Sequence, residues 1–360
     1  MIWKQGSHES VADNEERLAD GPSRRDFLKL GGIGLAAMAG SGCQGGKEQR
    51  QVADPNAAVA DIPVVLESAI NETRKKPYEP KTVQEHITEM TKVLDAGAAI
   101  AHNHSKQFDK DPKKAAQFYA EVYRALLKKH PHAIVYPTIN LDLEVLQEER
   151  RALAPGEACA HHRVLAEAGL TNMIMLDTGV SAVSVLAEDG IPIDKAFYVY
   201  QFWPDDIRFS RKICTDFGCG AAVAVYEPGW MKNVVAMAWA GTLPRGSKLN
   251  LFFGFDNFGS MPPPFPEALE LYLKMMEGLD LKWAVGCPLS DRSIMDTPLA
   301  RMALERGGHL RVGLEDHTTG PTNLEQLERA KELVAKVGRR IINGPEAIEY
   351  LDIPFPATRP

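Results

Sequence analysis

The stretch 98–104, AAIAHNH, places His102 and His104 one residue apart, directly after a run of apolar residues. In a β-strand, side chains at positions i and i+2 point to the same face. The two imidazoles are therefore expected side by side where a buried strand ends. Imidazole is a common ligand of divalent metals and a good hydrogen-bonding group. The pair predicts either a metal site or a hydrogen-bonded pair at the edge of the core.

Polar residues also lie at the ends of later apolar runs. They are Thr138, Asp177 and Glu227, together with Arg311, Glu315 and Asp316 of the segment LRVGLEDH. Carboxylates at such positions can bind a metal or transfer protons. Thr138, Asp177 and Glu227 are expected to bind the substrate. A structural ion pair between Arg311 and Asp316 is the alternative for the last segment. The adjacent pair His161 and His162 is expected on the solvent face of a helix.

The elements that must position these residues alternate regularly from residue 62 onward. The expected strands are 64–70, 98–104, 133–138, 173–177, 221–226, 249–255, 283–287 and 310–314, and the expected helices include 82–95, 113–129, 267–277 and 323–337. Eight such units predict an α/β fold, a (β/α)8 TIM barrel, with an extra C-terminal helix at 345–351 packed outside it. A doubly wound sheet is the alternative, but no Gly-x-Gly-x-x-Gly turn follows the first strand. The β-like run 196–202 has no clear place in this scheme.

A barrel of this kind would bring the polar residues together, because its functional residues lie at the C-terminal ends of the strands. The second and eighth strands both flank the first, so His102, His104 and Glu315 can converge. Two imidazoles and a carboxylate suit a divalent metal that keeps an open position and acts as a Lewis acid. Zn²⁺ is the default expectation, and Mn²⁺, Fe²⁺ or Co²⁺ would also accept these ligands.

The N-terminal residues 1–43 are expected to form an export signal rather than part of the barrel. Residues 23–29, SRRDFLK, precede a short apolar run rich in glycine and alanine, which resembles a twin-arginine (Tat) signal. That run is too short and too rich in glycine for a transmembrane span. Cys43 closes a lipobox-like AGSGC, residues 44–61 are a predicted linker, and residues 62–360 form the predicted barrel. The expected location is the periplasm, or the cell envelope if Cys43 carries lipid.

Composition excludes one class of partner. The chain of 360 residues has a formal net charge of −7 and no basic stripe, so nucleic acid is not an expected partner. The four cysteines after Cys43 form no Cys-x-x-Cys pair, which argues against a disulfide scaffold.

Three stretches resemble the β-keto acid cleavage enzymes, the family typified by 3-keto-5-aminohexanoate cleavage enzyme. They are LDAGAAIAHNHSK, WAVG and GGHLRVGLEDH, and the resemblance extends from about Val64 to Leu351. It implies a (β/α)8 barrel with Zn²⁺ held by His102, His104 and Glu315. It also implies that Asp316 is the base, that Arg311 orients it and binds the carboxylate region of the substrate, and that Thr138 contacts the substrate.

The usual reaction of that family converts a β-keto acid and acetyl-CoA into acetoacetate and a new acyl-CoA. Several features of this chain depart from the pattern, and two of them bear on the reaction. The fifth strand reads AAVAVYEPG, with Ala222 and Ala224 where family members often carry carboxylates and only Glu227 retained. An exported protein would also not meet acetyl-CoA, which is cytoplasmic, so another acceptor such as water is an alternative.

The sequence therefore predicts a metal-dependent enzyme that cleaves a carbon–carbon bond of a β-keto acid, and a homo-oligomer by family resemblance. Two alternatives stay open. One is a metal-dependent hydrolase or isomerase of a small carbonyl or sugar-acid compound, and the other is a non-catalytic protein that binds keto acids.

Overall fold

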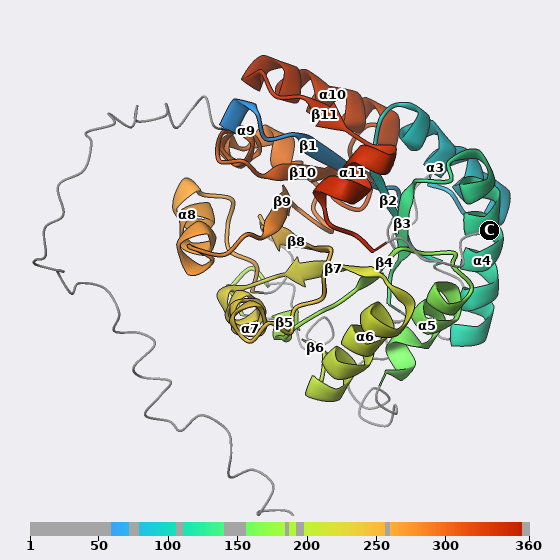
Figure 1. The fold of residues 1–360 in the computed structure, drawn as a ribbon. Coiled ribbons are helices and arrows are strands. Elements are labelled where there is room, and N and C mark those ends of the chain that lie inside the picture. The colour runs from blue at the N-terminus through green and yellow to red at the C-terminus, as the bar shows by residue number, and fades with distance from the viewer. Residues whose placement is uncertain are drawn as a thin grey trace, which may run out of the picture. The chain divides into compact units, whose positions relative to one another are not determined.

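The computed structural model describes residues 59–71, 79–105, 111–139, 156–183, 187–191, 198–255 and 260–354. The predicted signal at 1–43 and nearly all of the predicted linker at 44–61 lie outside these residues. The described chain forms a ring of parallel strands surrounded by helices (Figure 1). None of the described helices has the length and apolar character that a membrane crossing requires.

Eight parallel strands form the ring, in the order β3-β2-β1-β10-β9-β8-β7-β4. Their bounds are β1 Val64–Ala69, β2 Ile100–Asn103, β3 Ile134–Pro137, β4 Met173–Met175, β7 Gly220–Val225, β8 Ser247–Phe252, β9 Lys282–Gly286 and β10 His309–Val312. Each coincides with one of the eight predicted strands to within a few residues, so the predicted barrel is confirmed. Because β1 lies between β2 and β10, the ends of those two strands are close neighbours.

Side chains join the two ends of this sheet, β3 and β4. The Thr171 hydroxyl donates to the carbonyl of Val135 at 2.6 Å, and the Val135 amide donates to Asn172 Oδ1 at 3.4 Å. Both Thr171 and Asn172 are fully buried just before β4. These bonds take the place of a regular backbone ladder and nearly close the barrel.

Helices cover the outside of the ring and follow the strands in alternation. They are α3 Val83–Asp95, α4 Pro112–Lys129, η3 Glu157–Cys159, α5 Ala160–Glu167, α6 Pro204–Phe217, α7 Pro228–Trp239, α8 Pro266–Met275, η5 Ile294–Asp296, α9 Pro298–Glu305 and α10 Asn323–Val337. Local sequence sets their starts. For example, Thr82 caps α3 and exchanges hydrogen bonds with Glu85 in a capping box.

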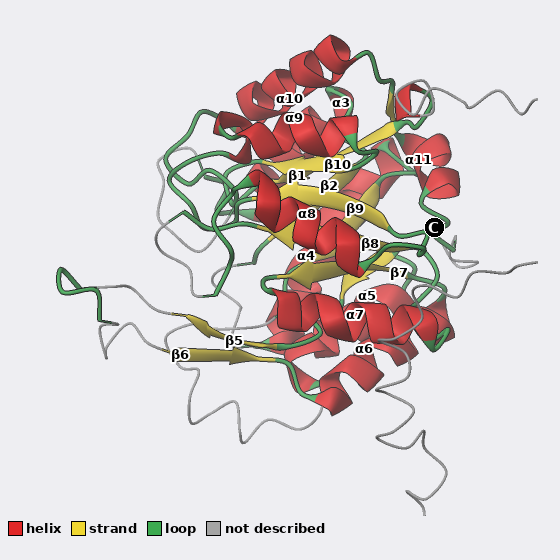
Figure 2. Cartoon of the chain, turned by 90° about the vertical axis from the view of Figure 1, so that its left-hand side faces the viewer, coloured by secondary structure: helices red, strands yellow, loops and turns green. Residues whose placement is uncertain are grey.

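The run 196–202 contributes to a separate hairpin. β6, Tyr198–Gln201, pairs antiparallel with β5, Val180–Val183, and both lie apart from the barrel sheet (Figure 2). The hairpin carries Tyr200 toward the C-terminal ends of the strands, where it lines the pocket described below.

The C-terminal helix is present, but its packing differs from the prediction. A short strand β11, Ile341–Ile342, pairs with β1 and leads into α11, Gly344–Tyr350. Ala347 and Ile348 of α11 share a buried cluster with Val65 and Ile100, which alternate with outward-facing residues of their strands. The helix therefore closes the N-terminal end of the barrel interior instead of joining the outer ring.

Candidate metal centre and pocket

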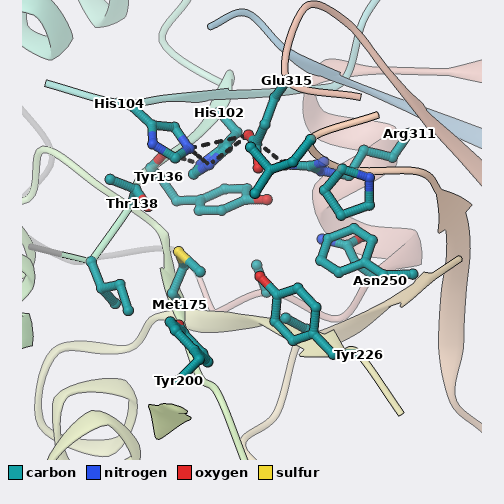
Figure 3. A pocket seen from close by; sticks show the side chains of 16 residues that line it. His102, His104, Tyr136, Thr138, Met175, Tyr200, Tyr226, Asn250, Arg311 and Glu315 are labelled. Atoms are coloured by element: carbon teal, nitrogen blue, oxygen red, sulfur yellow. Dashed lines mark hydrogen bonds and ion pairs between the residues drawn. The ribbon is translucent and has the colours of Figure 1, made fainter. Parts of the chain in front are cut away.

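His102, His104 and Glu315 converge on one point at the C-terminal mouth of the barrel (Figure 3). The Nε2 atoms of both histidines lie 3.2 Å from Glu315 Oε2, and they lie 3.2 Å from each other. His102 and Glu315 are buried, whereas His104 is half-buried. The structure thus brings together all three residues that the sequence named as ligands.

The local backbone explains this convergence. His102 lies in β2 and is paired with Ala69 of β1, and His104 follows two residues later on the same face. A tight turn after β10 brings Glu315 back to the same place, since its amide donates to the Ala69 carbonyl at 3.2 Å. Gly313 makes the turn possible, because its φ is +132° and a Cβ atom there would lie 2.2 Å from the Ala69 oxygen.

Neighbouring groups fix the His102 ring. Its Nδ1–H donates to the carbonyl of Tyr136 at 3.1 Å, and the Tyr136 ring stacks on it with centroids 4.4 Å apart. Burial lowers the pKa of His102, against the opposing effect of Glu315, which favours the neutral ring with its lone pair on Nε2. That lone pair faces the Glu315 carboxylate, and two such electron-rich atoms require a cation or a proton between them.

The donor set fits a divalent metal. A tetrahedral centre with bonds of about 2.0–2.1 Å separates its ligand atoms by about 3.3 Å. The three atom pairs here are each 3.2 Å apart. Two imidazole nitrogens and one carboxylate suit Zn²⁺ and related metals, and they leave a position toward the pocket.

Arg311 donates hydrogen bonds to three carboxylates, one of which is the candidate ligand Glu315. Its Nε donates to Glu67 at 2.9 Å, one terminal nitrogen donates to Asp316 Oδ1 at 2.6 Å, and the other donates to Glu315 Oε2 at 2.7 Å. Burial alone would raise the pKa of Glu315, but Arg311 and the two histidines outweigh it and hold that pKa well below its usual range. Glu315 is therefore ionised and held in place by Arg311.

Asp316 lies behind Glu315 and is sealed from solvent. It is 1% exposed and is not a residue of the pocket wall. Arg311 holds Oδ1, whereas Oδ2 makes no hydrogen bond within the described part of the chain. Burial raises the pKa of Asp316 to about 7, with Arg311 opposing and Glu315 adding to the rise. Such a carboxyl can gain or lose a proton near neutral pH.

Sequence reasoning missed a buried layer beneath the site. Glu67 of β1 is fully buried and accepts hydrogen bonds from Tyr136 and Lys248, each at 2.5 Å, as well as from Arg311. Burial would raise the pKa of Glu67, but Lys248 and Arg311 lower it to about 2. Glu67 lies within an apolar run and Lys248 directly precedes one, and only their charge next to apolar residues could have signalled a buried ion pair.

A pocket of about 760 Å³, its open mouth included, lies over the three candidate ligands. Its wall is largely aromatic or small, and it includes Tyr136, Thr138, Met175, Tyr200, Ala222, Ala224, Tyr226, Asn250, Phe252 and Arg311. Thr138 thus lies where the sequence placed a substrate contact. Ala222 and Ala224, which replace larger side chains in the predicted pattern, leave open space in this wall.

Besides Asp316, two of the predicted site residues lie away from the pocket wall. Asp177 is fully buried, and its carboxylate accepts a hydrogen bond from the hydroxyl of Tyr200. Glu227 is half-buried at the N-terminus of α7. Asp177 acts on the pocket through Tyr200, whereas Glu227 touches no wall residue through a described hydrogen bond.

The second histidine pair contradicts its prediction. His161 and His162 are both fully buried rather than on a solvent face. Their Nε2–H groups donate to one acceptor, the carbonyl of Thr138, at 2.6 and 3.0 Å. The error has a physical reason: α5 packs its N-terminal turn against the end of β3, where the Thr138 carbonyl has no strand partner among the residues that the structure describes. The pair satisfies that carbonyl and holds the backbone of a pocket residue.

The chain is thus an α/β barrel protein with a candidate metal site, two imidazoles and a carboxylate, at the mouth of the barrel. A sequence model of the β-keto acid cleavage enzyme family matches residues 62–353. The chain therefore belongs to the β-keto acid cleavage enzyme family.

Its curated relatives are distant. A 3-keto-5-aminohexanoate cleavage enzyme of Acetoanaerobium sticklandii is 24% identical over 293 residues, covering 77% of this chain and 92% of the relative. A 3-oxoadipate:acetyl-CoA acetyltransferase of Cupriavidus necator is 23% identical over 301 residues, covering 81% of this chain and 94% of the relative. Among solved structures, ObcA in complex with oxaloacetate superposes with a TM-score of 0.52 at 16% identity, covering 78% of this chain and 68% of ObcA. That likeness concerns the fold.

Proposed function

We propose that this chain is a divalent-metal enzyme, with Zn²⁺ the default metal, that cleaves a carbon–carbon bond of a β-keto acid. The observation that carries the proposal is the convergence of His102, His104 and Glu315 at the floor of a pocket. Membership of the β-keto acid cleavage enzyme family supports the reaction type. One relative is named as an acetyltransferase that uses 3-oxoadipate and acetyl-CoA, which supports acetyl-CoA as the second substrate.

The metal, when bound, would withdraw electrons from the keto and carboxylate oxygens of the substrate and so favour cleavage toward an enolate. The chain's own residues prepare the site for this chemistry. Tyr136 fixes the His102 ring, and Arg311 holds Glu315 and Asp316 in place. Asp316 is the predicted base, and Oδ2 is its oxygen that Arg311 does not occupy. Because Asp316 is buried behind Glu315 and is not part of the pocket wall, it would exchange a proton with the substrate only through a neighbouring group. Thr138 at the pocket wall would contact the substrate.

The proposal extends to location and acceptor. The twin-arginine stretch at residues 23–29 supports export to the periplasm or the cell envelope. In that compartment acetyl-CoA is absent, so an exported form would use another acceptor such as water. Product formation depends on acetyl-CoA if acetyl-CoA is the acceptor, and it does not if water is the acceptor.

The test is a screen of freshly prepared β-keto acids with the purified zinc-loaded chain, with and without acetyl-CoA. Mass spectrometry should detect acetoacetate and a new acyl-CoA, or the two carboxylic acids if water is the acceptor. The His102→Ala/His104→Ala variant serves as the control and should form neither product. Equal product in this variant, or none from the metal-loaded wild type with any substrate, would overturn the proposal.

A further inference from the structure

Asn250 is a pocket residue whose side-chain amide oxygen accepts a hydrogen bond, while its NH₂ group donates none within the described part of the chain. It lies in β8, it is 3% exposed, and it forms part of the pocket wall. Lys248, two residues earlier on the same face of the strand, donates from Nζ to Asn250 Oδ1 and also to Glu67 at 2.5 Å. Figure 3 shows Asn250 across the pocket from His104.

The contact with Lys248 fixes which way the amide points. An ammonium group has three donors and no acceptor, so the atom that faces it must be the amide oxygen. Lys248 is itself fully buried and held by the Glu67 carboxylate, which leaves it no alternative position. The NH₂ group of Asn250 must therefore point away from Lys248.

Nothing in the described part of the chain accepts a hydrogen bond from this NH₂ group, and the group is not sealed from the pocket. The residues paired with Asn250 on the neighbouring strands are Ala224 of β7 and Ala284 of β9. Alanines on both sides leave open space around the amide. A buried donor that faces open space is poised for an acceptor atom of a ligand.

We propose that Asn250 donates a hydrogen bond to an additional oxygen of the substrate, distinct from the keto oxygen and from the carboxylate of the β-keto acid. Lys248 is the positioning residue that orients the Asn250 amide. The inference rests on the proposed function and narrows its substrate class. The substrate carries a hydroxyl, carbonyl or carboxylate oxygen beyond the keto group. An ammonium group at the same place would face two donors and be rejected.

The test measures binding rather than turnover. The affinity of the zinc-loaded full chain, without acetyl-CoA, is measured by calorimetry for 3-oxohexanoate and for two relatives of the same chain length, 5-hydroxy-3-oxohexanoate and 3-oxoadipate. The wild type should bind at least one oxygen-bearing acid about tenfold more tightly than 3-oxohexanoate, the size of one good hydrogen bond.

Variants assign that advantage to the amide. Asn250→Ala should abolish it, and Asn250→Asp, which keeps the volume and the Lys248 contact but offers only acceptors, should also abolish it. Lys248→Gln can present either a donor or an acceptor to Asn250, so it should reduce the advantage about threefold. The matched control Met175→Leu changes an apolar wall residue and should keep the advantage.

The outcomes separate the two proposals. If none of the three acids shows metal-dependent binding, the proposed function fails and this inference with it. If 3-oxohexanoate binds but the oxygen-bearing acids gain nothing, the assignment of Asn250 is wrong while the proposed function stands. The assignment is equally wrong if Asn250→Ala keeps the advantage.

Discussion

Two histidine pairs lie near the same end of the barrel and have opposite surroundings. His102 and His104 turn their Nε2 atoms toward a carboxylate, Glu315, beside a pocket. His161 and His162 turn theirs toward a backbone carbonyl in a sealed part of the core. The first pair is arranged to hold a cation, whereas the second can only donate protons to an oxygen that is already in place.

The difference lies in the partner and not in the histidines. A carboxylate facing a neutral imidazole lone pair needs a cation between them, while a carbonyl needs the N–H tautomer. Burial lowers the pKa of His102, of His161 and of His162 alike, so the charge state does not distinguish the pairs. In this barrel, the pair that shares its focus with a carboxylate is the candidate metal site, and the pair that shares a carbonyl is not.

The largest expected effect comes from removing that anionic partner. Glu315→Gln keeps the size of the side chain but removes its charge, so metal affinity should fall more than about 100-fold, since even outer partners of metal ligands contribute 10–100-fold. Turnover of any β-keto acid found in the screen should fall with it. Metal titration by calorimetry gives the affinity. An unchanged affinity would mean that the first pair does not depend on the carboxylate.

The second pair should respond in stability and not in metal binding. His161→Leu/His162→Leu leaves the Thr138 carbonyl without either donor, and a buried unsatisfied group costs about 1–3 kcal/mol. With the imperfect fit of leucine added, the free energy of unfolding should fall by about 2–5 kcal/mol. Urea unfolding of the metal-free chain measures it. A variant as stable as the wild type would show that the carbonyl finds water instead.

The same pair should also make stability depend on pH. Burial lowers the pKa of His162 to about 4 and that of His161 well below its usual value. Below about pH 6.5 both histidines become protonated in the unfolded chain but stay neutral in the folded chain. The free energy of unfolding therefore falls with decreasing pH, by up to about 1.4 kcal/mol per pH unit for each histidine, from about pH 6.5 toward pH 4.

The histidine contribution is read as the difference between wild type and His161→Leu/His162→Leu, because other buried acids titrate in both proteins. Urea unfolding at pH 7.5, 6.5, 5.5 and 5.0 should show stability curves that converge as the pH falls. Parallel curves over this range would contradict the assignment of two neutral, buried imidazoles.

Tyr136→Phe gives the smallest expected effect and separates the contacts that support His102. The variant keeps the carbonyl that accepts from His102 and the stacked ring, and it loses only the hydroxyl bond to Glu67. Stability should fall by about 1–2 kcal/mol, while the metal content stays unchanged. Thermal unfolding and metal analysis check both values. Loss of the metal would show that the Glu67 layer, and not the carbonyl, positions the ligand.

The sequence predicted the barrel well because each strand is a short apolar run and the runs alternate regularly with amphipathic helices. It also predicted the three candidate ligands, since strand alternation and the neighbourhood of β1 place them together. It failed for His161 and His162, whose shared carbonyl lies 23 and 24 residues earlier in the chain. It missed Glu67, Lys248 and Asn250, because only the barrel register shows that they face one another.

Zinc content distinguishes the two histidine pairs most directly. Zinc is quantified by inductively coupled plasma mass spectrometry after zinc loading and removal of free metal. The samples are the purified full chain as wild type and as the two double histidine variants. We expect about one zinc ion per chain for the wild type and for His161→Leu/His162→Leu, and almost none for His102→Ala/His104→Ala. Zinc retained by the His102→Ala/His104→Ala chain, or lost from the His161→Leu/His162→Leu chain while it remains folded, would contradict the distinction between the two pairs.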